Sequence, residues 1–266
     1  MLNFIRSLFG TATPAPAPHG LSFDHWPAAI YAIGDIHGCL TELRQLEQMI
    51  AADAADIAGE KWIIWLGDMV DRGPSSSAVL DRAMANPPPG FVRYCLMGNH
   101  EAMMLQFMQA PSPRSDWLTF GGMETLYSYG MSGSVFDKSG QRQLQAIIDS
   151  HIPADHLTFL DRLPLWIALP GIVFVHAGIR RGRPMAEQSE RDLLWIRDEF
   201  FNAPDIDGVM VVHGHTPAAE PVVLPNRLCL DTGAFATGAL TAARLQPGKA
   251  PHLLTTASDS PAASKP

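Results

Sequence analysis

Short apolar runs typical of β-strands recur along the chain, and the first three are each followed by a stretch rich in helix formers. Strands that alternate with helices predict βαβ units around a buried sheet, which is an α/β fold. The last runs follow one another without long helices and indicate an added antiparallel section. In such sheets a functional site lies outside the carboxyl ends of the strands. The expected strands are residues 28–35, 61–68, 91–98, 171–178, 208–215, 227–234 and 239–246, with helices near 39–53, 75–86 and 100–110.

The two ends of the chain differ in composition from its middle. Residues 1–27 are expected to form an N-terminal segment and an Ala/Pro-rich linker, and residues 247–266, rich in Pro, Ala and Ser, a disordered tail. Residues 28–246 would then be the folded domain, with a mostly helical stretch at about 103–165. The opening MLNFIRSLFG makes a poor signal peptide. A weak peripheral contact of this segment with a membrane or partner remains open.

The net charge, the lack of long apolar runs and the cysteine content argue against several classes of protein. A net charge of −8 argues against a nucleic-acid partner, which usually selects a basic face. There is no apolar run of about 18 residues, so no transmembrane segment is expected. Cys39, Cys95 and Cys229 are odd in number and form no CxxC pair, which indicates buried thiols in a reducing compartment. We therefore expect a cytoplasmic protein.

Metal-ligand residue types stand at the carboxyl ends of the apolar runs. Each alone has an ordinary explanation, because a lone Asp or Asn is often a turn residue or helix cap and a lone His is often a hydrogen-bonded core residue. Together, Asp, His and Asn are ligand types for borderline divalent metals, and the topology would carry them to one edge. The residues are Asp35 and His37, Asp68, Asp71 and Arg72, Asn99 and His100, His176, and His213 and His215.

The number of candidate ligands favours two metal ions. Two carboxylates against two dications leave a positive site, which suits a phosphate dianion and lowers the pKa of a bridging water to give a hydroxide nucleophile. Arg72 and Arg197 add donors for phosphate oxygens. The chemistry that follows is metal-assisted hydrolysis of a phosphate ester. The six candidate ligands are Asp35, His37, Asp68, Asn99, His176 and His215.

The motifs GDIHG, GDMVDRG, GNHE, HAG and GHTP, in this order, resemble those of a known family. They are similar to the phosphoprotein phosphatase branch of the calcineurin-like metallophosphoesterases, and most of all to the bacteriophage lambda type from bacteria and phages. The resemblance runs from about Tyr31 to Gln246. It implies a central β-sandwich flanked by helices, with a dimetal site at the carboxyl edge of the strands.

The resemblance also implies a role for each motif residue. His100 would be the proton donor, paired with Asp71, and Arg72 and Arg197 would bind the phosphate. The metals would be two divalent transition-metal ions, Mn²⁺ or else Fe and Zn. Asp35, His37 and a bridging Asp68 would hold the first metal, and Asp68, Asn99, His176 and His215 the second.

Several other residues have two interpretations or depart from the family. The family usually carries an arginine before GNHE, where this chain has Met97, which implies a missing phosphate contact; Met97→Arg is then expected to lower KM. His213 could reach the site or be structural, and Asp231 could orient a metal-bound histidine or close a turn. Glu101 is assigned to the helix dipole. Trp117, Trp166 and Trp195 are expected in the core, with Trp195 also placed to shape a pocket wall.

The expected activity is that of a phosphomonoesterase acting on phosphoserine and phosphothreonine in proteins, with phosphotyrosine as a further substrate. The main alternative is a symmetrical bis(5′-nucleosyl)-tetraphosphatase, which hydrolyses diadenosine tetraphosphate. Such enzymes tend to carry Asp after GNH and to lack the aspartate before RG, whereas this chain has Glu101 and Asp71. A catalytically inactive interaction module is disfavoured because all six candidate ligands are present.

Overall fold

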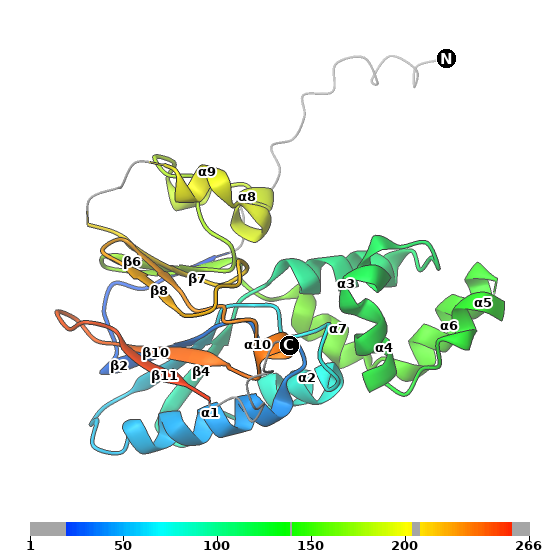
Figure 1. The fold of residues 1–266 in the computed structure, drawn as a ribbon, viewed down its shortest axis with the longest axis horizontal. Coiled ribbons are helices and arrows are strands. Elements are labelled where there is room, and N and C mark those ends of the chain that lie inside the picture. Colours follow the sequence, from blue (N-terminus) through cyan, green and yellow to red (C-terminus); the bar gives the residue numbers. More distant parts are fainter. Residues whose placement is uncertain (1–19, 139, 204–207, 257–266) are drawn as a thin grey trace, which may run out of the picture.

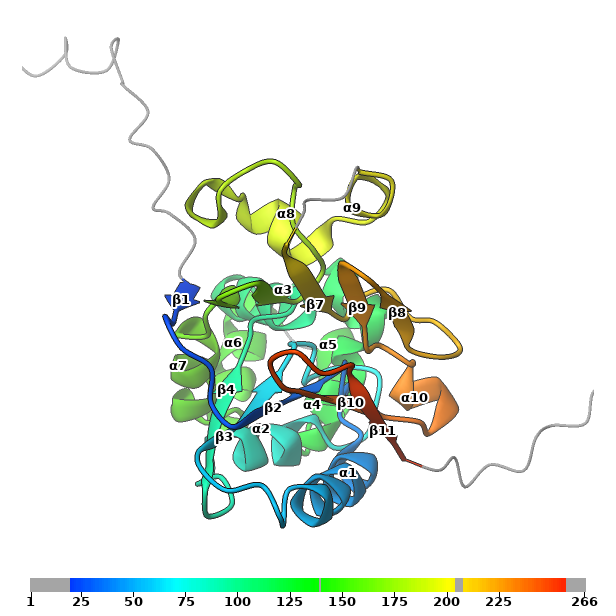
Figure 2. The same cartoon turned by 90° about the vertical axis from the view of Figure 1, so that its left-hand side faces the viewer.

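The fold is a sandwich of two β-sheets with helices on both outer faces. The computed structural model describes residues 20–138, 140–203 and 208–256. In Figure 1, α8 (Glu190–Trp195) and α9 (Asp198–Phe201) lie above the upper sheet, and α1 (Leu40–Asp53) and α2 (Ser76–Met84) lie below the lower one. The view in Figure 2 shows the same order of layers. The predicted α/β sandwich flanked by helices is confirmed.

The lower sheet contains the predicted βαβ units. Its strand order is β11-β10-β2-β3-β4. The neighbours β2 (Ala29–Ile33), β3 (Lys61–Trp65) and β4 (Phe91–Cys95) run parallel, and α1 and α2 make the two connections. The strands β10 (Thr241–Leu245) and β11 (His252–Thr255) add the antiparallel section beside β2.

The upper sheet is mixed, with the order β1-β5-β6-β7-β9-β8. Its centre is parallel: β6 (Ile172–Val175), β7 (Met210–His213) and β9 (Arg227–Cys229). Two hairpin-like antiparallel pairs flank it, formed by β5 (Trp166–Leu169) with β6 and by β8 (Val222–Leu224) with β9. The edge strand β1 (Gly20–Ser22) pairs parallel to β5.

A helical region between β4 and β5 projects to one side of the sandwich (Figure 1). This arrangement agrees with the helical stretch predicted near 103–165. Short helices η2 (Met185–Glu187) and α10 (Ala234–Thr237) lie in later connections. The projecting region comprises α3 (Asn99–Gln109), the π-helix η1 (Leu118–Gly122), α4 (Met123–Ser128), α5 (Ser134–Lys138), α6 (Gln141–His151) and α7 (Ala154–Asp161).

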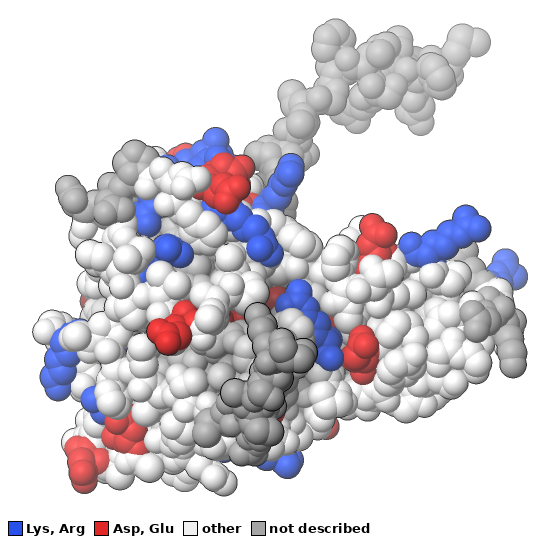
Figure 3. Space-filling model, in the orientation of Figure 1, with Lys and Arg blue, Asp and Glu red and all other residues white. Residues whose placement is uncertain are grey.

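The central strands are apolar on both faces because both faces are covered. In β2, Ile30 and Ala32 pack in the core between the sheets, whereas Tyr31 and Ile33 pack on the opposite face, in the core that includes residues of α1 and α2. Such strands are near-continuous hydrophobic runs in the sequence, which explains why they could be recognised. No helix within the described ranges is both long and apolar enough to cross a membrane. On the face seen in Figure 3, basic side chains are interspersed with acidic ones.

The domain limits need two corrections. Residues 252–255, inside the predicted disordered tail, form β11 against β10, so that prediction is wrong for this part of the tail. Residues 20–22, inside the predicted linker, form β1. Both strands lie at sheet edges, and their short sequences show no pattern that would distinguish them from a loop. Residues 1–19 and 257–266 fall outside the described part of the chain.

Candidate metal centre and active site

The predicted ligands lie together where the carboxyl ends of strands from both sheets meet. Asp35, Asp68 and Asn99 follow β2, β3 and β4 of the lower sheet, and His176 and His215 follow β6 and β7 of the upper sheet. All of them are buried. The sequence argument assumed a single sheet edge, whereas the structure builds the site from the edges of two packed sheets.

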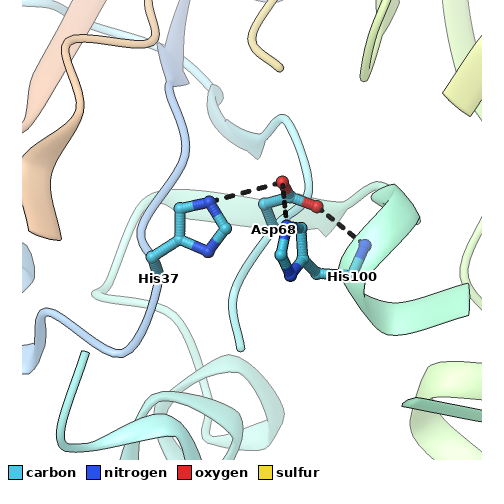
Figure 4. A group of neighbouring side chains, drawn as sticks. All are labelled: His37, Asp68 and His100. Carbon is cyan, nitrogen blue, oxygen red and sulfur yellow. Dashed lines mark hydrogen bonds and ion pairs between the residues drawn. The ribbon is translucent and has the colours of Figure 1, made fainter. Parts of the chain in front are cut away.

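Asp68 is at the centre of this cluster. Its Oδ2 lies 3.4 Å from His37 Nε2, and its Oδ1 lies 3.4 Å from His176 Nε2. Figure 4 shows the carboxylate of Asp68 between His37 and His100. Two groups suited to a metal ion share this residue, one with His37 and His100 and the other with His176 and His215. The geometry suits a carboxylate that bridges two ions.

The protonation of the histidines creates a cluster of lone pairs. Burial lowers the pKa of His176, and it lowers that of His37 to about 3, so both are neutral at pH 7 and each carries one ring proton. The Nδ1–H of His37 donates to Val70 O at 2.8 Å, and that of His176 to Leu66 O at 2.9 Å. Each Nε2 therefore presents a lone pair to the oxygens of the cluster, and backbone carbonyls fix that tautomer as they do in metal sites.

Acceptor atoms face one another without a proton between them. His176 Nε2 lies 2.8 Å from Asn99 Oδ1. Because the ring proton of His176 is on Nδ1, no proton lies between this nitrogen and this oxygen. His215 Nδ1 lies 2.9 Å from the same oxygen; with the ring proton of His215 on Nδ1, its buried Nε2 keeps a lone pair that has no hydrogen-bond partner among the described residues. Unpaired lone pairs are costly in a buried site unless a cation binds them. The donor set, imidazole nitrogens with carboxylate and amide oxygens, fits a divalent transition metal.

The buried carboxyl groups of Asp35, Asp68 and Asp231 lie close together, and a bound cation would offset their mutual repulsion. Burial and the neighbouring carboxylates of Asp231 and Asp68 raise the pKa of Asp35 well above its ordinary value. The oxygens of Asp35 accept the backbone N–H of His215 at 3.0 and 3.2 Å, which ties the β2 end to the β7 end. Asp231 Oδ1 accepts Gly233 N–H at 2.9 Å, so Asp231 closes a turn beside Asp35.

Among the described residues, positive φ angles outside glycine are found only at this site. Positive φ in a residue other than glycine costs on the order of 1–3 kcal/mol and persists where the surroundings enforce it. Such strain often marks functional positions, and here every instance falls on a residue predicted to belong to the site. In the described part of the chain the non-glycine residues with positive φ are His37 (45°), Asp68 (49°), Asp71 (72°), Arg72 (66°) and His215 (66°).

Glu101 holds the loop that carries Asp68. Its Oε2 accepts the N–H groups of Asp68 and Gly98 at 2.8 Å each, and its Oε1 accepts those of Met69 at 2.7 Å and Val70 at 3.1 Å. The bond to Gly98 caps the N-terminus of α3, where the sequence predicted only an interaction of Glu101 with the helix dipole. The other three bonds were not foreseen, because they join segments about thirty residues apart.

His100 forms a buried pair with Asp71. Its Nδ1 lies 2.7 Å from Asp71 Oδ2. Burial of the imidazole opposes protonation, but the carboxylates of Asp68 and Asp71 outweigh it and raise the pKa of His100 above its ordinary value. Arg72 extends its guanidinium over the site, with Nη1 2.9 Å from His37 Nε2 and Nη2 3.0 Å from His100 Nε2.

A small pocket opens over the cluster. Its volume is about 110 Å³, and both predicted phosphate-binding arginines line it. Phe120 is 52% exposed and Trp195 44% exposed, and both rings lie at this pocket. Trp195 is thus a pocket-wall residue and not a core residue. The lining residues are Asp68, Arg72, Asn99, His100, Met103, Phe120, Trp195, Arg197 and His215.

The structure does not support a phosphate contact at position 97. The side chain of Met97 is 9% exposed and belongs to the apolar core, and it is not among the residues that line the phosphate pocket. The side chain at this position therefore does not point toward a substrate phosphate. Successive residues of an extended strand point to opposite sides, and nothing in the sequence shows which side Met97 takes.

The remaining candidates lie in the core. His213 is buried against the rings of Phe200 and Phe201, and its Nδ1 lies 2.9 Å from Gly214 O. Trp166 and Trp117 are buried, as expected. However, the indole of Trp117 also contacts Asp71, which the sequence did not reveal. All three cysteines are free and buried, as predicted.

The sequence from 28 to 239 matches the family described as calcineurin-like phosphoesterase. The chain belongs to this family. The calcineurin-like phosphoesterases are dimetal hydrolases of phosphate esters, and the cluster around Asp68 supplies the matching ligand types. The enzyme is therefore a metallophosphoesterase.

Named relatives of this phosphoesterase include nucleotide hydrolases. Two asymmetrical bis(5′-nucleosyl)-tetraphosphatases are similar over 232 residues, covering 80% of this chain: one from Halalkalibacterium halodurans (24% identical, 88% of its length) and one from Oceanobacillus iheyensis (25% identical, 86% of its length). Among solved structures, that of a candidate diadenosine tetraphosphatase superposes with a TM-score of 0.60 at 22% identity, covering 90% of this chain and 98% of the other.

A protein phosphatase shares the same fold. A serine/threonine protein phosphatase from Saccharomyces cerevisiae superposes with a TM-score of 0.55 at 15% identity, covering 93% of this chain and 86% of the other. At these identities the structural likeness establishes the fold of the phosphoesterase and leaves the substrate to be argued from the site.

Proposed function

We propose that this metallophosphoesterase is a phosphomonoesterase that hydrolyses phosphoserine and phosphothreonine in proteins, with phosphotyrosine as a further substrate. The observation that carries the proposal is the buried His100–Asp71 pair at the phosphate pocket, with 2.7 Å between Nδ1 and Oδ2. A serine alkoxide is a poor leaving group and needs a proton as its P–O bond breaks, so an enzyme for such esters needs a positioned acid.

The ligand assignment follows the two halves of the cluster. Asp68 would bridge two divalent ions, Mn²⁺ being the one we propose, with Fe and Zn as alternatives. When bound, the ions neutralise the phosphate charge and activate a water for attack on phosphorus. Asp35 and His37 would complete the first site, and Asn99, His176 and His215 the second.

The protein surrounds His100 with opposing influences. His100 lies in the first turn of α3, where the helix dipole disfavours a positive charge. The carboxylates of Asp71 and Asp68 counter this effect, because a nearby negative charge favours the protonated imidazole. Nε2, the ring nitrogen not bonded to Asp71, accepts from Arg72 Nη2 at 3.0 Å in this structure; once Arg72 turns to the phosphate, Nε2 is the atom that would carry the proton to the leaving oxygen.

Two arginines would orient the phosphate. Arg72 already lies within 3.0 Å of both His37 and His100, so its donors converge on the position of the reacting group. Arg197 lines the same pocket, on the segment between α8 and α9. Planar guanidinium groups bind phosphate oxygens through paired hydrogen bonds, which fixes the phosphorus for in-line attack.

A second candidate is the hydrolysis of dinucleoside tetraphosphates. Relatives bear that name, and the exposed rings of Phe120 and Trp195 stand at the pocket mouth. Aromatic rings at such a position could stack on nucleobases. The phosphate leaving group of this reaction needs little protonation, so the His100–Asp71 pair would contribute less to it.

One assay separates the two candidates. Mn²⁺-loaded enzyme is given a phosphoserine peptide, p-nitrophenyl phosphate and diadenosine tetraphosphate, and kcat/KM is measured for each. We expect kcat/KM to be higher for the phosphoserine peptide than for diadenosine tetraphosphate. A higher kcat/KM for diadenosine tetraphosphate would overturn the proposal, and chromatography of the products would then separate symmetrical cleavage into two ADP from asymmetrical cleavage into ATP and AMP.

The acid role is tested with His100→Asn. We expect a loss of roughly 10²–10⁴-fold in kcat on the phosphoserine peptide, typical of a missing general acid, and a much smaller loss on p-nitrophenyl phosphate. Metal content, measured on the same preparation, should not change. Equal losses on both esters, or a lost metal ion, would show that His100 is not the acid.

We also propose a cytoplasmic location, which the free cysteines support.

A further inference from the structure

We propose that Trp117 and Thr125 are positioning residues that orient the Asp71 carboxylate and, through it, the His100 proton donor. Neither residue belongs to a family motif singled out in the sequence, and both come from the helical region that projects beside the sandwich. The inference rests on the proposed role of His100 as the acid.

Both oxygens of Asp71 are held by this region. Oδ2 accepts the Trp117 indole N–H at 2.7 Å together with His100 Nδ1–H at 2.7 Å. Oδ1 accepts the Thr125 hydroxyl at 2.6 Å. The same hydroxyl oxygen accepts the backbone N–H of Asp71 at 2.8 Å. Asp71 is completely buried, so no solvent competes for these bonds.

The chemistry of the donors determines where the proton of the pair lies. An indole N–H can only donate, so Oδ2 must accept from Trp117 and cannot itself carry a proton toward it. The hydrogen bonds from Trp117 and Thr125 stabilise the ionised form of Asp71, which favours the shared proton on Nδ1 of His100. Hydrogen bonds to a charged acceptor are also the strongest in proteins, so the plane of the carboxylate is well defined.

The backbone around Trp117 is shaped to make this approach. The π-helix η1 is broken at Gly121, whose φ is 108°, and its carbonyl accepts the N–H of Arg72 at 3.2 Å. A Cβ on Gly121 would lie 2.5 Å from that nitrogen, and a Cβ on Gly122 would lie 2.5 Å from the Trp117 ring. A π-turn at a functional position is a recurrent device, and here it closes the region over Asp71 and Arg72.

A purely structural role is the competing explanation. Trp117 is buried and packs on Phe107 at a centroid distance of 4.7 Å, so its removal would damage the core in any case. A structural defect slows all substrates alike. Misorientation of the acid slows only those that need a proton on the leaving group. The leaving group therefore separates the two explanations.

The experiment uses two matched pairs of variants of the full chain, loaded with Mn²⁺. Thr125→Val removes the hydroxyl with little change in volume, and Thr125→Ser restores it. Trp117→Phe removes the indole N–H bonded to Asp71, and Trp166→Phe is its control, because Trp166 Nε1 is buried without a hydrogen-bond partner within the described residues. Values of kcat and KM are measured on a phosphoserine peptide and on p-nitrophenyl phosphate.

We expect Thr125→Val and Trp117→Phe each to lower kcat on the phosphoserine peptide by about 10- to 100-fold, the effect of one hydrogen bond to a charged group. KM for the peptide and kcat on p-nitrophenyl phosphate should change less than about 3-fold. Thr125→Ser and Trp166→Phe should retain nearly full kcat on both substrates. If Trp117→Phe does not fold, the Thr125 pair alone decides.

Equal losses on both substrates in Thr125→Val and Trp117→Phe would overturn the inference. His100→Asn, run in parallel, separates this failure from that of the proposed function. If His100→Asn selectively slows the peptide while the Thr125 and Trp117 variants do not, only the positioning role is wrong. If His100→Asn shows no such selectivity, the acid itself has been misassigned and the inference is overturned with it.

Discussion

Gly98 sits so close to the bridging carboxylate that a single methyl group should disable the metal site. An added Cβ at this position would lie 2.2 Å from Asp68 Oδ1, 2.3 Å from Asp68 N and 2.7 Å from Glu101 Oε2. Ordinary carbon contacts begin at 3.4 Å. Gly98→Ala therefore has to move Asp68, the residue shared by both metal groups, by about 1 Å.

The magnitude follows from that displacement. A misplacement of about 1 Å in a reacting constellation typically costs about 10²-fold in rate, so kcat/KM should fall at least that far. Overpacking in a buried site costs about 1–3 kcal/mol of unfolding free energy. The backbone itself is not the obstacle, because φ of −100° and ψ of 173° at Gly98 are open to alanine.

The chain offers a matched control for this substitution. Gly140 is likewise the N-cap of a helix with an extended backbone (φ −69°, ψ 162°), and a Cβ there meets no atom within 4 Å. Both substitutions remove a glycine from a helix N-cap, which has a small effect on stability. The difference between the effects of Gly98→Ala and Gly140→Ala therefore reports the clash with Asp68. Metal content, kcat/KM and urea unfolding are measured on both. If Gly98→Ala retained the metals and the activity of Gly140→Ala, our account of Asp68 as a fixed bridge would be refuted.

Three further outcomes can be checked separately. Wild-type protein should bind about two transition-metal ions and lose activity on chelation, and Asp68→Asn should damage metal binding most among the ligands; full activity after exhaustive chelation contradicts this. Met97→Arg should lower the unfolding free energy by about 3–5 kcal/mol in denaturant titrations, because it buries an unpaired charge, and should not improve KM. Burial lowers the pKa of His213 to about 3, below its unfolded value of 6.5, so its contribution to stability is present above pH 6.5 and is lost as the pH falls toward 3. In metal-free protein, His213→Gln should flatten the acid loss of stability by up to about 1.4 kcal/mol per pH unit, and an unchanged slope would count against a neutral buried imidazole.

The sequence by itself determined the α/β class and the types of the candidate ligands. Strands buried on both faces leave apolar runs that a reader can find, and Asp35, Asp68 and Asn99 stand directly after such runs. These ligands can be recognised from neighbouring residues alone, because a few consecutive residues show where a strand ends and which polar side chain follows it. The same is true of the first turn of α3, where Asn99, His100 and Glu101 are neighbours in sequence as well as in space.

Only the tertiary structure decided how those ends combine and what holds them. Two sheets meet at the site, Glu101 binds the loop of Asp68, and Trp117 and Thr125 bind Asp71 across 46 and 54 residues of chain. A buried tryptophan has the same sequence pattern whether its N–H meets a carboxylate or nothing, as Trp117 and Trp166 demonstrate within this protein. Packing between distant segments determines such hydrogen-bond partners. Hydrophobic periodicity in the sequence indicates which residues are buried, but it does not indicate which polar groups they contact.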